Sequence, residues 1–318
     1  MFTKIINKSV YVALLCFCTN IQAVDSVVID PDTGNFIVTY ESNGQVVNTV
    51  IVSSKHIKPE VKSRVTLDSS SDNKYKYMYR LENEEDSQQP IVSFVIDGGN
   101  IDSNSLASPD GWSSVLIPSE IYGNRIGWRF KRKAATDGLQ KDEDEDGFNY
   151  LSSDLPGVDI SRVRGGTTLI KYKGYGPDEK TTKEINKLIH PDNDSVKMVV
   201  IAPKIKVSSP INIIETLASF SEHIEEMKNK GFVTNELFVT VSTKLSTAIN
   251  YAKSDNSSAM LATLEALEEE LGDYKEETHT EEDNIVITFN SDDLDEIALQ
   301  VRDLIIYNVN EIIETLDP

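Results

Sequence analysis

The spacing of apolar residues changes once along the chain, close to Ser208. Up to about Val207, apolar residues fall on every second position in short runs that end at turn residues, as in half-buried antiparallel strands. From Ser208 onward they recur every three or four positions, as on amphipathic helices. We therefore predict an α+β chain of two domains. An N-terminal antiparallel β-sandwich is expected over residues 24–207, followed by a C-terminal antiparallel α-helical bundle over residues 208–318.

The first 23 residues predict a signal peptide. Lys4 and Lys8 precede the short apolar run VYVALLCFC, and the segment NIQA then ends on the small residue Ala23. This run is shorter than the roughly 20 residues that span a bilayer, so we expect export and a mature chain without a transmembrane segment. The protein is then periplasmic or extracellular. Both cysteines, Cys16 and Cys18, lie in this leader, so we expect a mature chain without thiols or disulfides.

The charge of the chain excludes one class of partner. The sequence carries 31 Lys and Arg against 52 Asp and Glu, a net charge of −21. Such a field repels phosphate backbones, so we expect no nucleic-acid binding. The acidic residues are concentrated behind Ser208, where 24 of them face 6 basic residues, against 28 and 23 in residues 24–207. This asymmetry supports a domain boundary near Ser208.

The front region predicts a series of paired strands. Asn43 and Gly44 form a strong two-residue hairpin signal between two alternating runs. The run KYKYMYRLEN places its tyrosines on one face, and PIVSFVID supplies the expected partner strand. Further strands are expected in SSVLI, RIGWRFKRK, TTLIKYKG and VKMVVIAPKIKV. One short helix is expected over residues 182–189.

Several motifs between residues 75 and 170 follow one another in a recognisable order. YKYMYRLENEEDSQQPIVSFVID is followed by ASPDGW, IGWRF, GFNYLSSDLPGV and RGGTT. This order resembles uncharacterised exported bacterial β-domains, with a Y-x-Y strand, a P-x-G-W turn and a G-F-x-x-x-S-x-x-L-P-G segment. The resemblance implies a β-domain architecture and no particular chemistry.

The segment LQKDEDEDGFNY contains a candidate metal site. Asp142, Asp144 and Asp146 occupy alternate positions directly before Gly147, as at the start of many calcium loops. In such loops closely spaced carboxylates supply the oxygen ligands, and the glycine permits a sharp turn. Ser153 stands where the loop would place its bidentate Glu, and no helix is predicted on either side. Two alternatives therefore stay open: a calcium site, and a solvated acidic run before a strand.

Aromatic residues supply a second candidate site. A row of aromatic side chains on a sheet either stacks against sugar rings or fills the core, and we expect the tyrosine row to be core. Trp112 follows the turn SPDG and is the candidate ligand-binding residue if it lies at a loop tip. Trp128 alternates with Ile126 and Phe130, so we expect it to be buried.

Four helices are predicted behind Val207. Ser208 or Ser209 is expected to cap the first, with Pro210 in its first turn, and Gly231 is expected to end it. The second and third lie in ELFVTVSTKLSTAINYAKS and SSAMLATLEALEEELGDY. The fourth lies in SDDLDEIALQVRDLIIYNVNEIIETL, with Ser291 as its cap. Before it, the acidic connection KEETHTEEDN leads into IVITF, which is either an edge strand or a buried loop.

The helical region is similar to the FIMAH module of secreted bacterial adhesins and hydrolases. The residues that match its pattern are Gly231, Lys244, Leu245, Ala248 and Leu264, and in a shifted register Leu294, Ala298, Leu304 and Ile305. The sequence departs from the pattern at Leu267 and Glu268, where the module carries Phe-Ile. In that family the module is an appendage, so the resemblance implies a non-catalytic role.

The sequence contains no catalytic motif that we recognise. The four histidines are scattered, and we expect His190 and His223 to be solvated. Neither a G-x-S-x-G motif nor a phosphate-binding or dinucleotide-binding fingerprint occurs. We therefore predict that the chain is not an enzyme but a secreted binding or interaction module, with no firm cofactor and a protein or glycan partner.

Two other functions stay open from the sequence. One is a secreted hydrolase or glycan-active enzyme with an unrecognised site, and the other is an adhesion or structural protein ordered by calcium. Trp112 exposed among carboxylates would favour the enzyme, as would a single continuous core with polar groups converging on a deep cleft. Buried aromatic residues throughout would favour the binding module.

Overall fold

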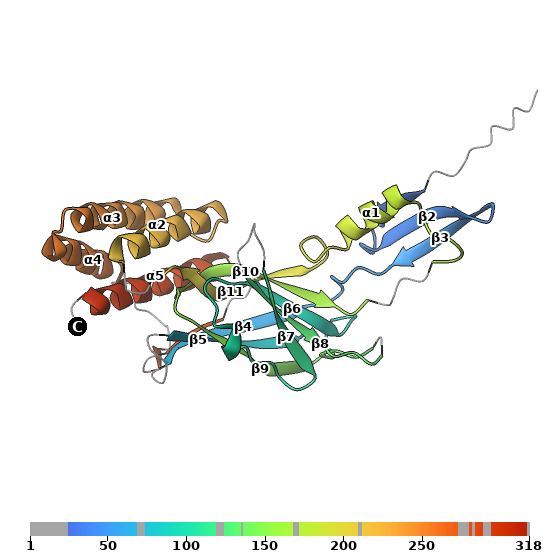
Figure 1. Cartoon of the computed structure of the whole chain (residues 1–318), viewed down its shortest axis with the longest axis horizontal. Helices are drawn as coiled ribbons and strands as arrows, with labels where there is room; N and C mark the ends of the chain where they lie inside the picture. The colour runs from blue at the N-terminus through green and yellow to red at the C-terminus, as the bar shows by residue number, and fades with distance from the viewer. Residues whose placement is uncertain are drawn as a thin grey trace, which may run out of the picture.

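The computed structural model describes residues 25–68, 74–118, 124–134, 136–167, 172–208, 212–272, 280–281, 284–288 and 294–316. The predicted signal peptide, both cysteines and the predicted cap Ser291 lie outside these residues. Figure 1 shows three parts in a row along the longest axis. Four long helices lie at one end, two large sheets lie in the middle, and a small sheet with one helix lies at the other end.

The middle part is a β-sandwich of two five-stranded antiparallel sheets. Their strand orders are β11-β10-β6-β8-β7 and β12-β13-β4-β5-β9. The bounds are β4 Pro59–Asp68, β5 Lys74–Asn83, β6 Ile91–Asp97, β7 Trp112–Ile117, β8 Arg125–Phe130, β9 Glu143–Ser152, β10 Leu155–Gly165, β11 Val196–Ile205, β12 Thr280–Glu281 and β13 Asn284–Thr288. The strands predicted in KYKYMYRLEN, PIVSFVID, SSVLI, RIGWRFKRK and VKMVVIAPKIKV are thus confirmed. The strand predicted in TTLIKYKG lies largely outside the described residues, and its described residues, 167 and 172–174, belong to no strand.

The tyrosine row of β5 fills the space between the two sheets. Tyr77 stacks on Tyr150 of β9 with the ring centroids 5.3 Å apart, and Tyr79 packs edge-on against Phe94 of the opposite sheet. The Tyr79 hydroxyl donates to the carbonyl oxygen of Ile201 at 2.7 Å, so its polar tip is satisfied inside the core. The predicted core role of these aromatic residues is confirmed.

A separate three-stranded sheet lies at one end of the molecule. Its order is β1-β2-β3, with bounds Ser26–Ile29, Phe36–Ser42 and Gln45–Ile51. Helix α1, Glu179–Leu188, covers one face of this sheet, which confirms the predicted short helix. Val38, Tyr40 and Ile185 belong to a core cluster that is distinct from the core of the sandwich.

The hairpin within this sheet is confirmed, but its expected place in the sandwich is not. Asn43 and Gly44 both have positive φ, 54° and 74°, as a two-residue type I′ turn requires. The two strands pair with each other, β2 also pairs with β1, and the sheet packs against α1 instead of a second sheet. Alternation identifies a buried face, whereas the element that buries it depends on residues far along the chain.

The side chain of Asp194 joins the small sheet to the sandwich. This buried carboxylate accepts a hydrogen bond from the Ser53 hydroxyl at 2.6 Å and another from the Ser54 backbone amide at 3.1 Å. The guanidinium of Arg164 on β10 lies 3.7 Å from the same carboxylate. Hydrogen bonds to an ionised group are the stronger kind, so this cluster fixes the exit of β3 against the sandwich.

The predicted helices are present, and each packs against the next along the chain. Their bounds are α2 Ile213–Asn229, α3 Asn235–Lys253, α4 Ser257–Gly272 and α5 Leu294–Leu316. The cap of α2 is Asn212, whose side chain accepts from the amide of Glu215, in place of the expected Ser208 or Ser209. Gly231 ends the helix as predicted, with a φ of 81°.

The helices and the sandwich share one hydrophobic core. Leu217 and Phe220 of α2 belong to the same buried cluster as the inner residues of β10 and β11. In addition, β13 pairs with β4, with Ile285 opposite Val65 in the backbone register, so IVITF is a strand of the sandwich. The boundary near Ser208 therefore marks a change of period but no break in the core.

Candidate functional site

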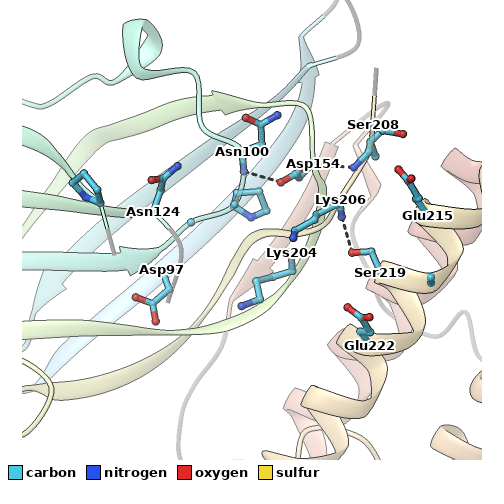
Figure 2. A pocket seen from close by; sticks show the side chains of 16 residues that line it. Asp97, Asn100, Asn124, Asp154, Lys204, Lys206, Ser208, Glu215, Ser219 and Glu222 are labelled. Carbon is cyan, nitrogen blue, oxygen red and sulfur yellow. Dashed lines mark hydrogen bonds between the residues drawn. The ribbon is translucent and has the colours of Figure 1, made fainter. Parts of the chain in front are cut away.

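A cleft of about 1200 Å³ lies between the sandwich and α2 and is partly open to solvent. Figure 2 shows that one wall is formed by the ends of sandwich strands and their loops, and the other by one side of α2. The polar residues that line it are Asp97, Asn100, Asn124, Asp154, Lys204, Lys206, Ser208, Glu215, Ser219 and Glu222. The described residues that line the cleft include no histidine, tyrosine or tryptophan.

Asp154 is a buried carboxylate at the sandwich wall, with 2% of its surface exposed. Its two oxygens accept hydrogen bonds from the backbone amides of Asn100 at 2.7 Å and Val207 at 3.3 Å (Figure 2). A Cβ atom on Gly99 would lie 2.4 Å from Oδ2, so only glycine permits this close approach. Burial raises the pKa of Asp154, and the two amides and Lys206 oppose that rise.

The wall formed by α2 carries acidic side chains. Glu215 and Glu222 are exposed on its cleft side (Figure 2). The hydroxyl of Ser219 accepts from the backbone amide of Lys206 at 2.9 Å, which ties the helix to the segment after β11. Among the described residues, no carboxylate lies within ion-pair distance of the Lys206 ammonium. The sandwich wall thus offers two cations, of which Lys204 is paired with Asp159, and the helix wall offers two exposed anions.

A buried polar cluster lies behind the cleft, where α2 meets β10 and β11. His223 has 3% of its surface exposed, and its Nε2 accepts from the backbone amide of Val158 at 3.1 Å. Its Nδ1 lies 3.6 Å from the Glu226 carboxylate, too far for a hydrogen bond. The expectation that His223 is solvated is wrong, because the sandwich covers the helix face on which it lies.

The charges around His223 are paired across the same interface. Lys204 of β11 lies 2.9 Å from Asp159 of β10, and Lys230 lies 3.1 Å from Asp159 and 2.8 Å from Glu226. Burial lowers the pKa of His223, against the opposing effect of Glu226. Contacts with His223, Lys230 and Lys204 hold the pKa of Glu226 well below its usual value, although burial opposes this.

Asp97 connects the cleft to a second charge network on the outer face of the sandwich. Its carboxylate lies 2.7 Å from Arg125 and 3.1 Å from Arg162. Both arginines also reach Asp192, at 3.3 Å and 2.8 Å. Each carboxylate is thus shared between two guanidinium groups, which leaves Asp97 as a structural residue at the rim of the cleft.

Among the described residues that line the cleft, no nucleophile is held beside a base. The hydroxyls of Ser208 and Ser219 accept hydrogen bonds from the backbone amides of Asn212 and Lys206, both at 2.9 Å. Nucleophilic catalysis needs a hydroxyl or thiol within reach of a general base, and His223 faces the Val158 amide behind the wall. The arrangement can instead bind a polar ligand through fixed donors and acceptors.

Trp112 does not lie at a loop tip. It is the first residue of β7, has 1% of its surface exposed, and packs edge-on against Phe130 and Phe148 with ring centroids 5.4 Å and 5.0 Å away. The predicted ligand-binding role is therefore contradicted, since no face of the indole is open. The turn SPDG ends one residue earlier, and the strand carries the ring into the core. Trp128 is buried as predicted.

The three aspartates of the predicted calcium loop do not surround a common point. Asp142 occupies a turn with a φ of 63°, whereas Asp144 and Asp146 lie on β9. An extended strand separates alternate residues by roughly 6–7 Å, so their carboxylates form a row. Asp144 is already paired with Arg80 at 3.0 Å. In the part of the chain that the structure describes, no group of three acidic, histidine or cysteine side chains is placed to hold a metal ion.

The sequence did not predict the residues that line the cleft, and the reason is physical. Asp154 is one of 52 acidic residues, and nothing local shows that its carboxylate turns inward to meet two distant amides. Lys206 and Ser219 come together only through the packing of α2 on β11.

Comparisons with known proteins give no family for this chain. No family model and no curated protein matches it. A crystal structure of an uncharacterised protein from Nocardia farcinica, described as having an immunoglobulin-like fold, aligns with 43% of this chain and 96% of its own, at 12% identity and a TM-score of 0.24. Among the described residues, no helix is both long and apolar enough to cross a membrane.

Proposed function

We propose that this chain is an exported, non-catalytic binding protein that takes its partner in the cleft between the sandwich and α2. The observation that carries the proposal is that polar side chains in the cleft are already hydrogen-bonded to backbone amides. Asp154 and Ser219 each accept hydrogen bonds from backbone amides, so they shape the walls and leave no reactive pair. The aromatic residues of the sandwich support the same conclusion, since they form its core.

The charges of the cleft indicate the chemistry of the partner. Lys206 lies on one wall, the carboxylates of Glu215 and Glu222 lie on the other, and the amide side chain of Asn124 lines the sandwich side (Figure 2). A polyanion would meet two exposed carboxylates, so nucleic acid and acidic glycans fit poorly. A neutral glycan, or a peptide that carries both donors and acceptors, fits the walls better.

The location of the protein and its division into domains belong to the same proposal. Export rests on the leader pattern of residues 1–23, with cleavage after Ala23. We retain the helices behind Val207 as an antiparallel bundle with a FIMAH-like pattern, supported by the packing of each helix on the next. Mass spectrometry of the secreted protein tests the first point, since cleavage as proposed makes Val24 the first residue.

A matched pair of variants tests the proposed cleft. Ala218 lies on the cleft side of α2, so Ala218→Trp would fill the space, whereas Ala262 is exposed on α4 and Ala262→Trp would leave the cleft open. The wild type and both variants are applied to an array of neutral and acidic glycans and to a displayed library of short peptides. We expect probes held by the wild type and by Ala262→Trp to be lost by Ala218→Trp. Equal retention by both variants would disprove the cleft as the binding site.

One observation favours the hydrolase as a second candidate. Asp154 is a buried carboxylate beside the cleft, and burial raises the pKa of this carboxylate, as in general acids. The core is also continuous from the sandwich to the helices. Glycoside hydrolysis needs a second carboxylate across the bond, and Glu222 is one of the two acids on the opposite wall. If the wild type hydrolyses glycans of the array, and if Asp154→Asn and Glu222→Gln each abolish this activity, the hydrolase replaces the binding protein as the proposed function.

A further inference from the structure

The small sheet has an unprotected edge at β3. The outer edge of this strand pairs with no other strand among the described residues, because β3 pairs with β2 alone. Its sequence, QVVNTVI, contains no charged residue, proline or glycine. Natural sheets usually protect such an edge with one of these residues or with a bulge. The opposite edge is β1, which is only 4 residues long and lies between Asp25 and Asp30.

The backbone groups at this edge alternate in a defined way. The hairpin closes with Ser42 opposite Gln45 around a two-residue turn, so Gln45 and every second residue after it bond to β2. The amide and carbonyl groups of Val46, Asn48 and Val50 therefore point away from β2, toward the open edge. A second strand beside β3 could pair with all of them.

The side chains of the same residues are exposed on the face of the sheet that α1 does not cover. Val46 and Val50 are 61% and 59% exposed. The register places Val50 beside Ile37 and Ile37 beside Val28, which is 54% exposed, so an apolar row crosses the whole sheet. Exposed apolar rows of this kind mark interaction sites.

The order of residues in β3 makes it complementary to itself. Asn48 is the middle residue of the strand, and the two exposed valines lie two positions before and after it. An antiparallel second β3 centred on Asn48 places Val46 beside Val50 of the other copy and Asn48 beside Asn48. The two uncharged strands meet no like charge, and a two-fold contact of this type closes on itself.

The position of the sheet also suits a second copy. Figure 1 shows the small sheet and the helices α2–α5 at opposite ends of the molecule. The chain has a net charge of −21, and 24 of its acidic residues follow Val207. Contact through β3 keeps those two acidic regions far apart, well beyond the roughly 8 Å over which charges interact at physiological salt. We propose that two copies of the chain associate through antiparallel pairing of β3 with β3, which joins the two small sheets into one.

A cysteine at the proposed two-fold axis tests the pairing. In a background with Cys16→Ser and Cys18→Ser, Asn48→Cys places the only thiol of each chain where the facing Cα atoms would be about 5.5 Å apart, within disulfide range. Mild oxidation is expected to give a disulfide-linked dimer on a non-reducing gel. The control Val239→Cys, at a residue of α3 that is 58% exposed, is expected to stay monomeric. Equal cross-linking of both variants would overturn the proposal.

Association without a cross-link is measured by sedimentation equilibrium between about 1 µM and about 100 µM protein. The wild type and Val239→Lys are expected to reach twice the monomer mass, whereas Val50→Lys, which places a cation at the edge, is expected to stay monomeric. Adding Val50→Lys to Asn48→Cys is expected to abolish the disulfide. A monomeric wild type over the whole range, or a dimer that Val50→Lys leaves intact, would refute pairing through β3.

Discussion

Replacing Gly157 with alanine tests how tightly α2 is held against the sandwich. A Cβ atom at this position would lie 2.4 Å from Nε2 and 2.8 Å from Cδ2 of His223, and 2.7 Å from Cβ of Lys204. No real Cβ atom tolerates such contacts, so the imidazole must move. The residue is on β10, and the ring is buried at the interface with α2, so there is little room for the movement.

The expected loss in the free energy of unfolding of Gly157→Ala has two parts. Displacing the ring breaks its hydrogen bond with the Val158 amide and leaves a buried donor unsatisfied, at about 1–3 kcal/mol. Forcing an extra methyl group into a packed interface costs about 1–3 kcal/mol more. We therefore expect the free energy of unfolding of Gly157→Ala to fall by about 2–6 kcal/mol, and its Tm by roughly 5–15 °C.

Urea and thermal unfolding, followed by circular dichroism, measure the effect. Gly272→Ala is the matched control, since no described atom lies within 4 Å of a Cβ there. The control is expected to change stability by less than about 1 kcal/mol, in the stabilising direction. In a His223→Ala background, Gly157→Ala should lose the part of its cost that comes from the ring and keep the part that comes from Cβ of Lys204. Equal unfolding midpoints for Gly157→Ala and Gly272→Ala would show that the contact between α2 and the sandwich has room for the extra methyl group, and would refute the tight packing around His223.

Three further predictions concern pH, the small sheet and calcium. Burial lowers the pKa of folded His223, so the unfolded chain binds that proton first and stability falls as the pH drops below the ordinary value of 6.5. Urea midpoints at about pH 7.5 and about pH 5 should differ less for His223→Gln, and an unchanged difference would exclude His223 as the cause. Asp194→Ala should cost about 3–5 kcal/mol because Arg164 loses its buried carboxylate, and Asp194→Asn should cost less; equal urea midpoints for both would contradict this. Millimolar calcium should leave Tm unchanged because Asp144 pairs with Arg80, and a rise that grows with calcium would restore the calcium prediction.

Sequence patterns predicted the elements of this fold better than their partners. The tyrosine run became β5 and the apolar spacing behind Val207 became α2–α5, because side-chain period and burial are local consequences of one another. The hairpin at Asn43 and Gly44 was equally local. That the hairpin packs on α1, or that IVITF pairs with β4, depends on contacts between residues more than one hundred positions apart.

The candidate site was harder to predict than the fold. Trp112 and the aspartates of LQKDEDEDGFNY drew attention as residue types, yet the strand geometry buried the first and spread the second into a row. Asp154 and His223 gave no such signal, because their roles come from backbone amides supplied by other elements. A pattern of side chains says little about sites that are completed by main-chain groups.

The pairing of β13 with β4 has a consequence for how the polypeptide is made. The neighbour of Val65 in this ladder is Ile285, so a ribosome must complete nearly the whole chain before β4 gains its second neighbour. Until then the nascent sandwich carries an open strand, which is the kind of surface that invites aggregation. A gene cut at Ser208 would make this temporary exposure permanent, because the missing strand lies on the discarded half.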